Sequence, residues 1–198
     1  MKTRRMLLNG LNRTLEGAGF DARFVAGSVI DTGAQADRAR AIADRLNAVR
    51  PGLDKQPVVL WSLPGQSAVT VRGRFIYVSK ILAERLGDDA LAFVLAHEMA
   101  HHDLGHVANP LGTLVALGFG SDAEHHADEK ALEIVMAAGF DPSGGLQALG
   151  PEVWGEEAEV EAEHPPRGPR RWLRRWTQSH PPTPERLAAI ERWIAEHS

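Results

Sequence analysis

The sequence predicts an α+β protein that is mostly helical, with a small β-sheet before its most apolar helix. Apolar residues recur at helical spacing in residues 34–49 and again, more densely, in residues 90–104. Between these segments lie three short runs of β-forming residues, at 57–61, 68–71 and 74–78. The chain has 198 residues and no internal repeat, so we expect one domain over its whole length.

The first half of the chain carries clear start and stop signals. The helix predicted over residues 34–49 ends at 51–52, where a proline and a glycine interrupt the apolar pattern. A glycine in the turn 72–73 joins the last two β-forming runs and predicts a hairpin. Ser79 is expected to be the N-cap of a short helix that ends near residues 86–87.

Two strong helices follow. The apolar helix is predicted over residues 88–106, and Asp88 and Asp89 place negative charge at its positive N-terminal end. A second helix is predicted over residues 122–138, where Gly139 supplies the left-handed residue that commonly ends a helix.

The C-terminal part alternates between helix signals and charged residues. Asp141 and Pro142 have the N-cap and first-turn chemistry that begins a helix. Residues 152–176 are a charged segment in which five glutamates within 156–163 are followed by five arginines within 167–175, and the sequence does not define its role. Residues 177–198 are expected to contain a His-Pro loop and a last helix capped by Thr183.

Composition excludes several classes of protein. The chain has no cysteine, which excludes disulfides, thiolate metal sites and cysteine nucleophiles. Any metal site must therefore use nitrogen and oxygen ligands. The formal net charge of −4 lacks the basic footprint of a dedicated nucleic-acid binder, so we expect no nucleic-acid partner.

Residues 1–33 are expected to be an N-terminal lead-in. Their basic start is followed by an apolar run only at 6–8, which is shorter than a secretory signal requires. The longest apolar stretch, 110–119, is too short to span a membrane. We therefore expect a cytoplasmic protein, although a piece of a longer protein would give the same pattern.

Histidine is concentrated in one part of the chain. Six of the nine histidines fall within residues 97–126, and His97, Glu98 and His101 form an H-E-x-x-H motif. Residues four apart share one face of a helix, so both imidazoles can reach a single ion. Glu98 points to one side of that face, where it can take a proton from a metal-activated water molecule.

A catalytic zinc usually takes three protein ligands and leaves one position for water. A metzincin would need glycine and histidine where the chain has Leu104 and Val107, and His106 is one residue short of that spacing. We expect His106 to contact the negative end of the helix instead. Glu124 and Asp128 lie four apart on the next predicted helix. Glu124 can be the third ligand, and Asp128 can accept the free N–H of a ligating histidine.

Four segments together resemble one protein family. They are H-E-x-x-H at 97–101, E-x-x-A-D at 124–128, Gly-Phe-Asp-Pro at 139–142 and Ser-His-Pro-Pro-Thr-Pro-Glu-Arg at 179–186. From about residue 57 to 190 the chain resembles the HtpX-like, CAAX-prenyl-protease family of zinc metallopeptidases. Its connection 102–123 is too short for the membrane-spanning helices of the integral members.

The resemblance implies a gluzincin-like zincin fold with one Zn²⁺ per chain. It implies that His97, His101 and Glu124 are the zinc ligands and that Glu98 is the general base. Asp128 would hydrogen bond to His97.

The family element S-H-P-x-x-x-x-R adds two candidates, His180 and Arg186. The resemblance implies that both approach the active site. We expect His180 to donate a hydrogen bond to the oxyanion of the reaction, with Arg186 as the alternative donor.

These residues predict a zinc-dependent metalloendopeptidase. Its partner would be a peptide or an unfolded protein, bound as an added strand near residues 67–71. A catalytically weak or latent zinc-binding chaperone or interaction module is the alternative, and Glu98 favours the enzyme because a structural zinc site needs no base. A peripheral membrane or nucleic-acid contact through the arginines and tryptophans of 170–176 is a third reading. The sequence predicts no oligomeric state.

Overall fold

The fold is given by a computed structural model, which describes residues 29–30, 32–62, 68–71, 75–106, 121–150, 180 and 183–197. The lead-in before residue 29, the turn 72–73, most of the connection 102–123, the charged segment 152–176 and most of the His-Pro loop lie outside the described residues.

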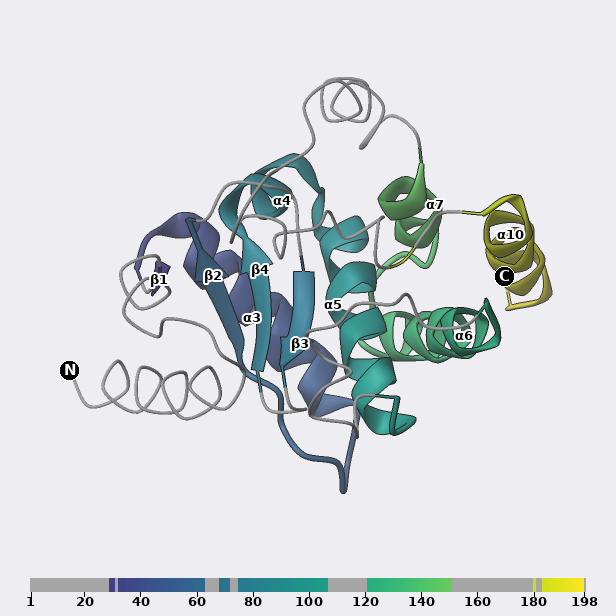
Figure 1. The fold of residues 1–198 in the computed structure, drawn as a ribbon, viewed down its shortest axis with the longest axis horizontal. Coiled ribbons are helices and arrows are strands. Elements are labelled where there is room, and N and C mark those ends of the chain that lie inside the picture. Colours follow the sequence, from purple (N-terminus) through teal and green to yellow (C-terminus); the bar gives the residue numbers. More distant parts are fainter. Residues whose placement is uncertain are drawn as a thin grey trace, which may run out of the picture.

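A four-stranded mixed sheet forms one side of the structure (Figure 1). Its strands are β1 (Val29–Ile30), β2 (Val58–Trp61), β3 (Ala68–Val71) and β4 (Phe75–Ser79), in the order β1-β2-β4-β3. Strands β2 and β4 are parallel, whereas β1 and β3 are antiparallel to their neighbours. The antiparallel pair β3–β4 confirms the predicted hairpin pairing, and it places β3 last in the described sheet.

Helix α5 (Asp88–Asp103) is the predicted apolar helix, and it occupies the centre of the fold. Every residue from Ala90 to His101 is buried. A helix that is apolar all round must be covered on all sides. The sheet, α3 (Ala34–Ala48), α6 (Ser121–Ala137) and α7 (Gly144–Leu149) provide this cover.

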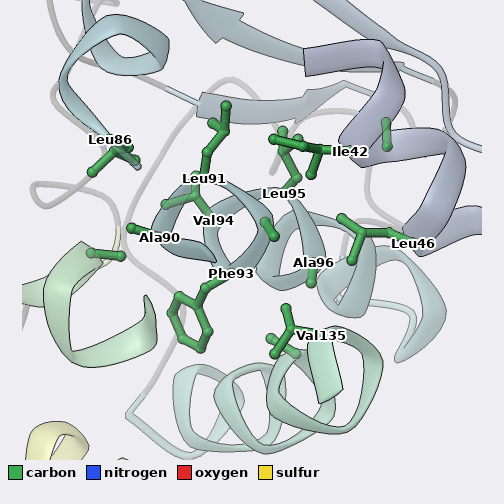
Figure 2. Packing of buried hydrophobic residues seen from close by; sticks show 14 of the residues in the cluster. Ile42, Leu46, Leu86, Ala90, Leu91, Phe93, Val94, Leu95, Ala96 and Val135 are labelled. Atoms are coloured by element: carbon green, nitrogen blue, oxygen red, sulfur yellow. The ribbon is translucent and has the colours of Figure 1, made fainter. Parts of the chain in front are cut away.

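Figure 2 shows how α5 is enclosed by apolar side chains. Ile42 and Leu46 reach it from α3, and Val135 reaches it from α6. Phe93 lies on the opposite side of α5 from Leu91 and Leu95, towards α6 and α7. Burial of these side chains stabilises the fold by roughly 25 cal/mol for each Å² of apolar surface removed from water.

The short helix α4 (Lys80–Arg85) follows β4 directly, as the sequence predicts. The Ser79 hydroxyl accepts a hydrogen bond from the backbone N–H of Leu82 at 3.2 Å, which confirms Ser79 as the N-cap. The chain then turns and begins α5, so the sheet and the central helix are joined by a short connection.

A buried ion pair ties the end of α3 to the end of α5. Arg50, just after α3, donates from Nε to Oδ2 of Asp103 at 2.8 Å and from Nη2 to Oδ1. Its Nη1 also donates to Oδ1 of Asn47 at 2.9 Å. The Arg50 and Asp103 side chains are 3% and 5% exposed, so each charge depends on the other for compensation.

Helix α6 ends as predicted, because Gly139 has a φ of 74° and takes the left-handed conformation. The next helix differs from the prediction. Asp141 does accept a hydrogen bond from the N–H of Ser143 at 2.8 Å, but the α-helix begins at Gly144 rather than at Pro142. The backbone before it forms tighter bonds three residues apart, from Gly144 to Asp141 and from Gly145 to Pro142.

The last helix, α10 (Pro184–His197), packs on α6 and α7. The hydroxyl of Thr183 accepts a hydrogen bond from the N–H of Arg186 at 3.3 Å, as expected of an N-cap. Together these elements confirm the α+β class, with helices around a small sheet that precedes the central helix. Within the described ranges, every helix is too short or too polar to cross a membrane.

Gly144 should not tolerate a side chain. A Cβ atom built there would lie 2.4 Å from the backbone carbon of Asp89 and 2.7 Å from the backbone nitrogen of Ala90, at the start of α5. We expect Gly144→Ala to lower the free energy of unfolding by about 1–3 kcal/mol, despite the better helix propensity of alanine. Urea denaturation measures this change. Gln147→Ala, at an exposed position of the same helix, is the control and should stay within about 0.5 kcal/mol of the parent protein. A Gly144→Ala variant as stable as the control would contradict the close approach of α7 to α5.

Candidate metal centre

Helices α5 and α6 face each other where the motif residues lie. His97 and His101 are one turn apart on α5, and Glu124 and Asp128 are one turn apart on α6. All four are buried, and the packing of α5 on α6 brings the two pairs together. His180 enters the same space from the segment before α10.

Four side chains converge on one point. The ligand atoms of His97, His101, Glu124 and His180 all lie within 4.8 Å of one another. Nε2 of His97 is 3.5 Å from Oε2 of Glu124, and Nε2 of His101 is 3.4 Å from Oε1 of Glu124. The Nε2 atoms of His97 and His101 are 2.9 Å apart. Ligands of a tetrahedral zinc lie about 3.3 Å from one another, so this set fits a zinc ion.

The orientation of His97 is set by Asp128. Nδ1 of His97 lies 2.9 Å from Oδ1 of Asp128. An ionised carboxylate only accepts hydrogen bonds, so Nδ1 carries the proton and Nε2 presents a lone pair to the other ligands. This is the contact that the sequence predicted for Asp128.

Arg186 lies behind the two carboxylates of α6. Its Nε and Nη2 donate to the two oxygens of Asp128, both at 2.7 Å, and its Nη1 is 3.1 Å from Oε2 of Glu124. Burial alone would raise the pKa of Asp128, but hydrogen bonds from Arg186 and His97 outweigh burial and lower it. For Glu124, hydrogen bonds from histidines of the site overcome burial in the same way, and the pKa is lowered. Both carboxylates are therefore charged and able to act as acceptors or ligands.

Glu98 lies beside the convergence point. It is 3% exposed, and its Oε1 is 3.3 Å from Nε2 of His180. Burial would raise the pKa of Glu98, but the charge of His180 and its hydrogen bond lower the pKa to about 2. Glu98 is thus an ionised carboxylate that faces the site, which is the form a general base requires.

His180 contacts three of the motif residues. Its Nδ1 is 3.1 Å from Nε2 of His97 and 3.0 Å from each oxygen of Glu124. Burial would lower the pKa of His180, but the charge of Glu98 and hydrogen bonds to Glu98 and Glu124 raise the pKa to about 9. The sequence predicts that His180 approaches the site, but it gives no sign that Nδ1 lies among the ligand atoms.

The sequence predicts that His106 contacts the negative end of the helix, but its side chain contacts a motif histidine. His106 lies just beyond α5, and its Nδ1 is 2.9 Å from Nδ1 of His101. Burial lowers the pKa of His101 to about 4, and the charge of His97 adds to this effect. His101 is therefore neutral at pH 7, the form that binds metals. The glycine before His106 is the sequence signal that could have indicated a reversal of the chain towards His101.

Comparison with known families supports the assignment of this site. The model of Peptidase family M48 matches residues 47–119 and 108–194 of the chain. These ranges include the motif residues of α5 and α6 and the residues of α10 that contact them. Among curated proteins, none matches the chain.

The buried guanidinium of Arg186 should be needed for stability. We expect Arg186→Met to lower the free energy of unfolding of the metal-free protein by about 3–5 kcal/mol, because two buried carboxylates lose their cation. Urea denaturation in the presence of a chelator measures this loss. The control is Arg192→Met, at an exposed position of the same helix, with an expected change within about 0.5 kcal/mol. Similar losses in the two variants would show that Arg186 does not compensate the carboxylates.

Proposed function

The chain belongs to peptidase family M48, because the model of that family matches more than half of it, and from that premise we propose that it is a zinc-dependent metalloendopeptidase. The observation that carries the proposal is the buried group of His97, His101 and Glu124 with the ionised Glu98 beside it. A structural zinc site is closed to water and therefore needs no ionised carboxylate beside its ligands.

One zinc ion per chain would be held by Nε2 of His97, Nε2 of His101 and the carboxylate of Glu124. Their mutual distances of 2.9–3.5 Å support this ligand set. Zinc supplies Lewis-acid activation, which lowers the pKa of water to about 7 and polarises a peptide carbonyl. Asp128 holds the His97 ring in the tautomer that leaves Nε2 free.

Glu98 is the general base of this proposal. Its carboxylate takes a proton from the attacking water molecule and later gives that proton to the leaving amine. The low pKa of Glu98 supports the first role, because the carboxylate is free of its proton at pH 7.

His180 is proposed as the donor to the oxyanion. Its raised pKa of about 9 keeps both ring nitrogens protonated at pH 7, and its position beside Glu98 supports a place near the scissile bond. Arg186 is less suited to that role, because it makes two hydrogen bonds of 2.7 Å to Asp128 and lies behind the carboxylates of α6 rather than beside Glu98. We propose that Arg186 holds these two carboxylates in place.

The proposed substrate is a flexible or unfolded protein segment that binds as an added strand. Strand β3 is the last strand of the described sheet, and it contacts α5, which carries the motif. An extended peptide paired with β3 would therefore run close to the central helix, and its backbone would be recognised independently of its side chains.

Glu98→Gln tests the enzyme. The amide keeps the size of the side chain but cannot take a proton, so we expect cleavage of β-casein to fall at least about 100-fold. Zinc content, measured by atomic absorption, should stay at that of the parent protein. Glu129→Gln, at an exposed position of α6, is the control and should retain both properties. Unchanged cleavage by Glu98→Gln would rule out the assigned base.

A latent zinc-binding module of the same fold is the second candidate function. The position of His180 favours it, because Nδ1 of His180 lies among the ligand atoms. A zinc site with four protein ligands is closed and leaves no position for water. In that arrangement the chain would bind metal and protein partners without cleaving them.

His180→Ala separates the two functions. For an oxyanion donor, we expect the rate of β-casein cleavage to fall about 10²–10³-fold, with zinc retained by the three other ligands. A rate that rises in His180→Ala would instead support the latent module, since the variant opens the fourth position to water.

A further inference from the structure

The backbone at the end of α5 reverses in a defined way. Gly105 has a φ of 75°, and its N–H donates to the carbonyl of His102 at 3.0 Å. The N–H of His106 donates to the carbonyl of His101 at 2.9 Å. These two bonds form a Schellman motif, in which the second residue after the C-cap donates its N–H to a carbonyl in the last turn of the helix. The motif thus brings His106 back onto His101.

The side chains of His106 and His101 are in direct contact as well. Nδ1 of His106 is 2.9 Å from Nδ1 of His101, and the two rings meet at 61° with their centroids 5.1 Å apart. In a Schellman motif this position is often filled by an apolar contact. Here it is filled by a hydrogen bond between two imidazoles.

A histidine that binds a metal through one ring nitrogen needs a hydrogen-bond acceptor for the N–H of the other. A neutral imidazole that binds a metal through Nε2 carries its proton on Nδ1, and that N–H needs an acceptor. For His97 the acceptor is the carboxylate of Asp128 at 2.9 Å. Nδ1 of His106 stands in the corresponding place for His101.

We propose that His106 is a positioning residue for the metal ligand His101. It accepts the Nδ1 proton of His101, and so keeps Nε2 unprotonated and directed at Glu124 and His97. The proposal rests on the metal site of the proposed function. It also explains why a glycine follows the central helix, because a residue with a Cβ rarely adopts the φ that returns His106 to His101.

The two ligands of α5 are thus supported differently. Asp128 is buried and paired with Arg186, so it is a charged and rigid acceptor. His106 is partly exposed and lies in a turn, so it is an acceptor held mainly by the backbone. The loss of His106 should therefore weaken metal binding without unfolding the protein.

Zinc affinity tests the proposal. We expect His106→Leu to bind zinc about 10–100-fold more weakly than the parent protein, measured by competition with a chromophoric chelator. His106→Asn should bind within about 3-fold of the parent protein, because its Oδ1 can accept in the place of Nδ1. His102→Leu, at the neighbouring histidine, is the control and should also stay within about 3-fold. Equal affinity of His106→Leu and the parent protein would overturn the proposal, as would equal weakening in His102→Leu.

A second measurement separates the proposal from the metal site itself. Long-range ¹H–¹⁵N spectra of the metal-free protein report which ring nitrogen of His101 carries the proton. We expect the Nδ1–H form in the parent protein and in His106→Asn, and a mixture of both forms in His106→Leu. If the parent protein binds no zinc, the proposed function fails and these spectra alone decide the role of His106. The same tautomer of His101 in all three proteins would then overturn the proposal.

Discussion

Buried charge at the contact between α5 and α6 constrains the rest of the structure. Helix α5 is covered on all sides because it is almost wholly apolar, yet its last turns carry two imidazoles and the carboxylate of Glu98. Groups of this kind are costly to bury unless they are paired or bind a metal. Glu124 and Asp128 on α6 contact the imidazole of His97, Arg186 on α10 pairs with these two carboxylates, and His180 pairs with Glu98. Helix packing and charge balance are therefore achieved by the same contacts, and neither can change without the other.

Both ends of the motif helix are held by groups that come from distant parts of the chain. The start of α5 is approached by the backbone of α7 at Gly144, and its end is tied by the ion pair of Arg50 and Asp103. These contacts leave α5 little freedom to slide or rotate. The ring nitrogens of His97 and His101 are thus held in place before any ion arrives, which lowers the cost of ordering the site on metal binding.

Local structure was predicted well because its signals are local. Ser79 caps α4 and Gly139 ends α6 through contacts with neighbouring residues, and the spacing of His97 and His101 places both rings on one face. The predicted beginning of α7 was wrong, because the turn at Asp141 depends on a distant contact, in which the backbone N–H of Asp141 donates to Oδ1 of Asp89, 52 residues earlier in the chain. The position of His180 could not be derived from spacing either, since it depends on how α10 packs on α6 and α7. The assignment of catalytic roles stays a prediction, because it concerns atoms that move during the reaction.

The order of the site residues along the chain has a consequence for synthesis. His180 meets His97 across 83 residues, and Arg186 meets Asp128 across 58 residues. A nascent chain that ends before Arg186 lacks the cation that pairs with Glu124 and Asp128. Burial of these two carboxylates then costs free energy that no ion pair offsets. The complete set of site groups is therefore present only after α10 has been synthesised. The proposed peptidase would therefore have no complete active site until the synthesis of α10 has ended.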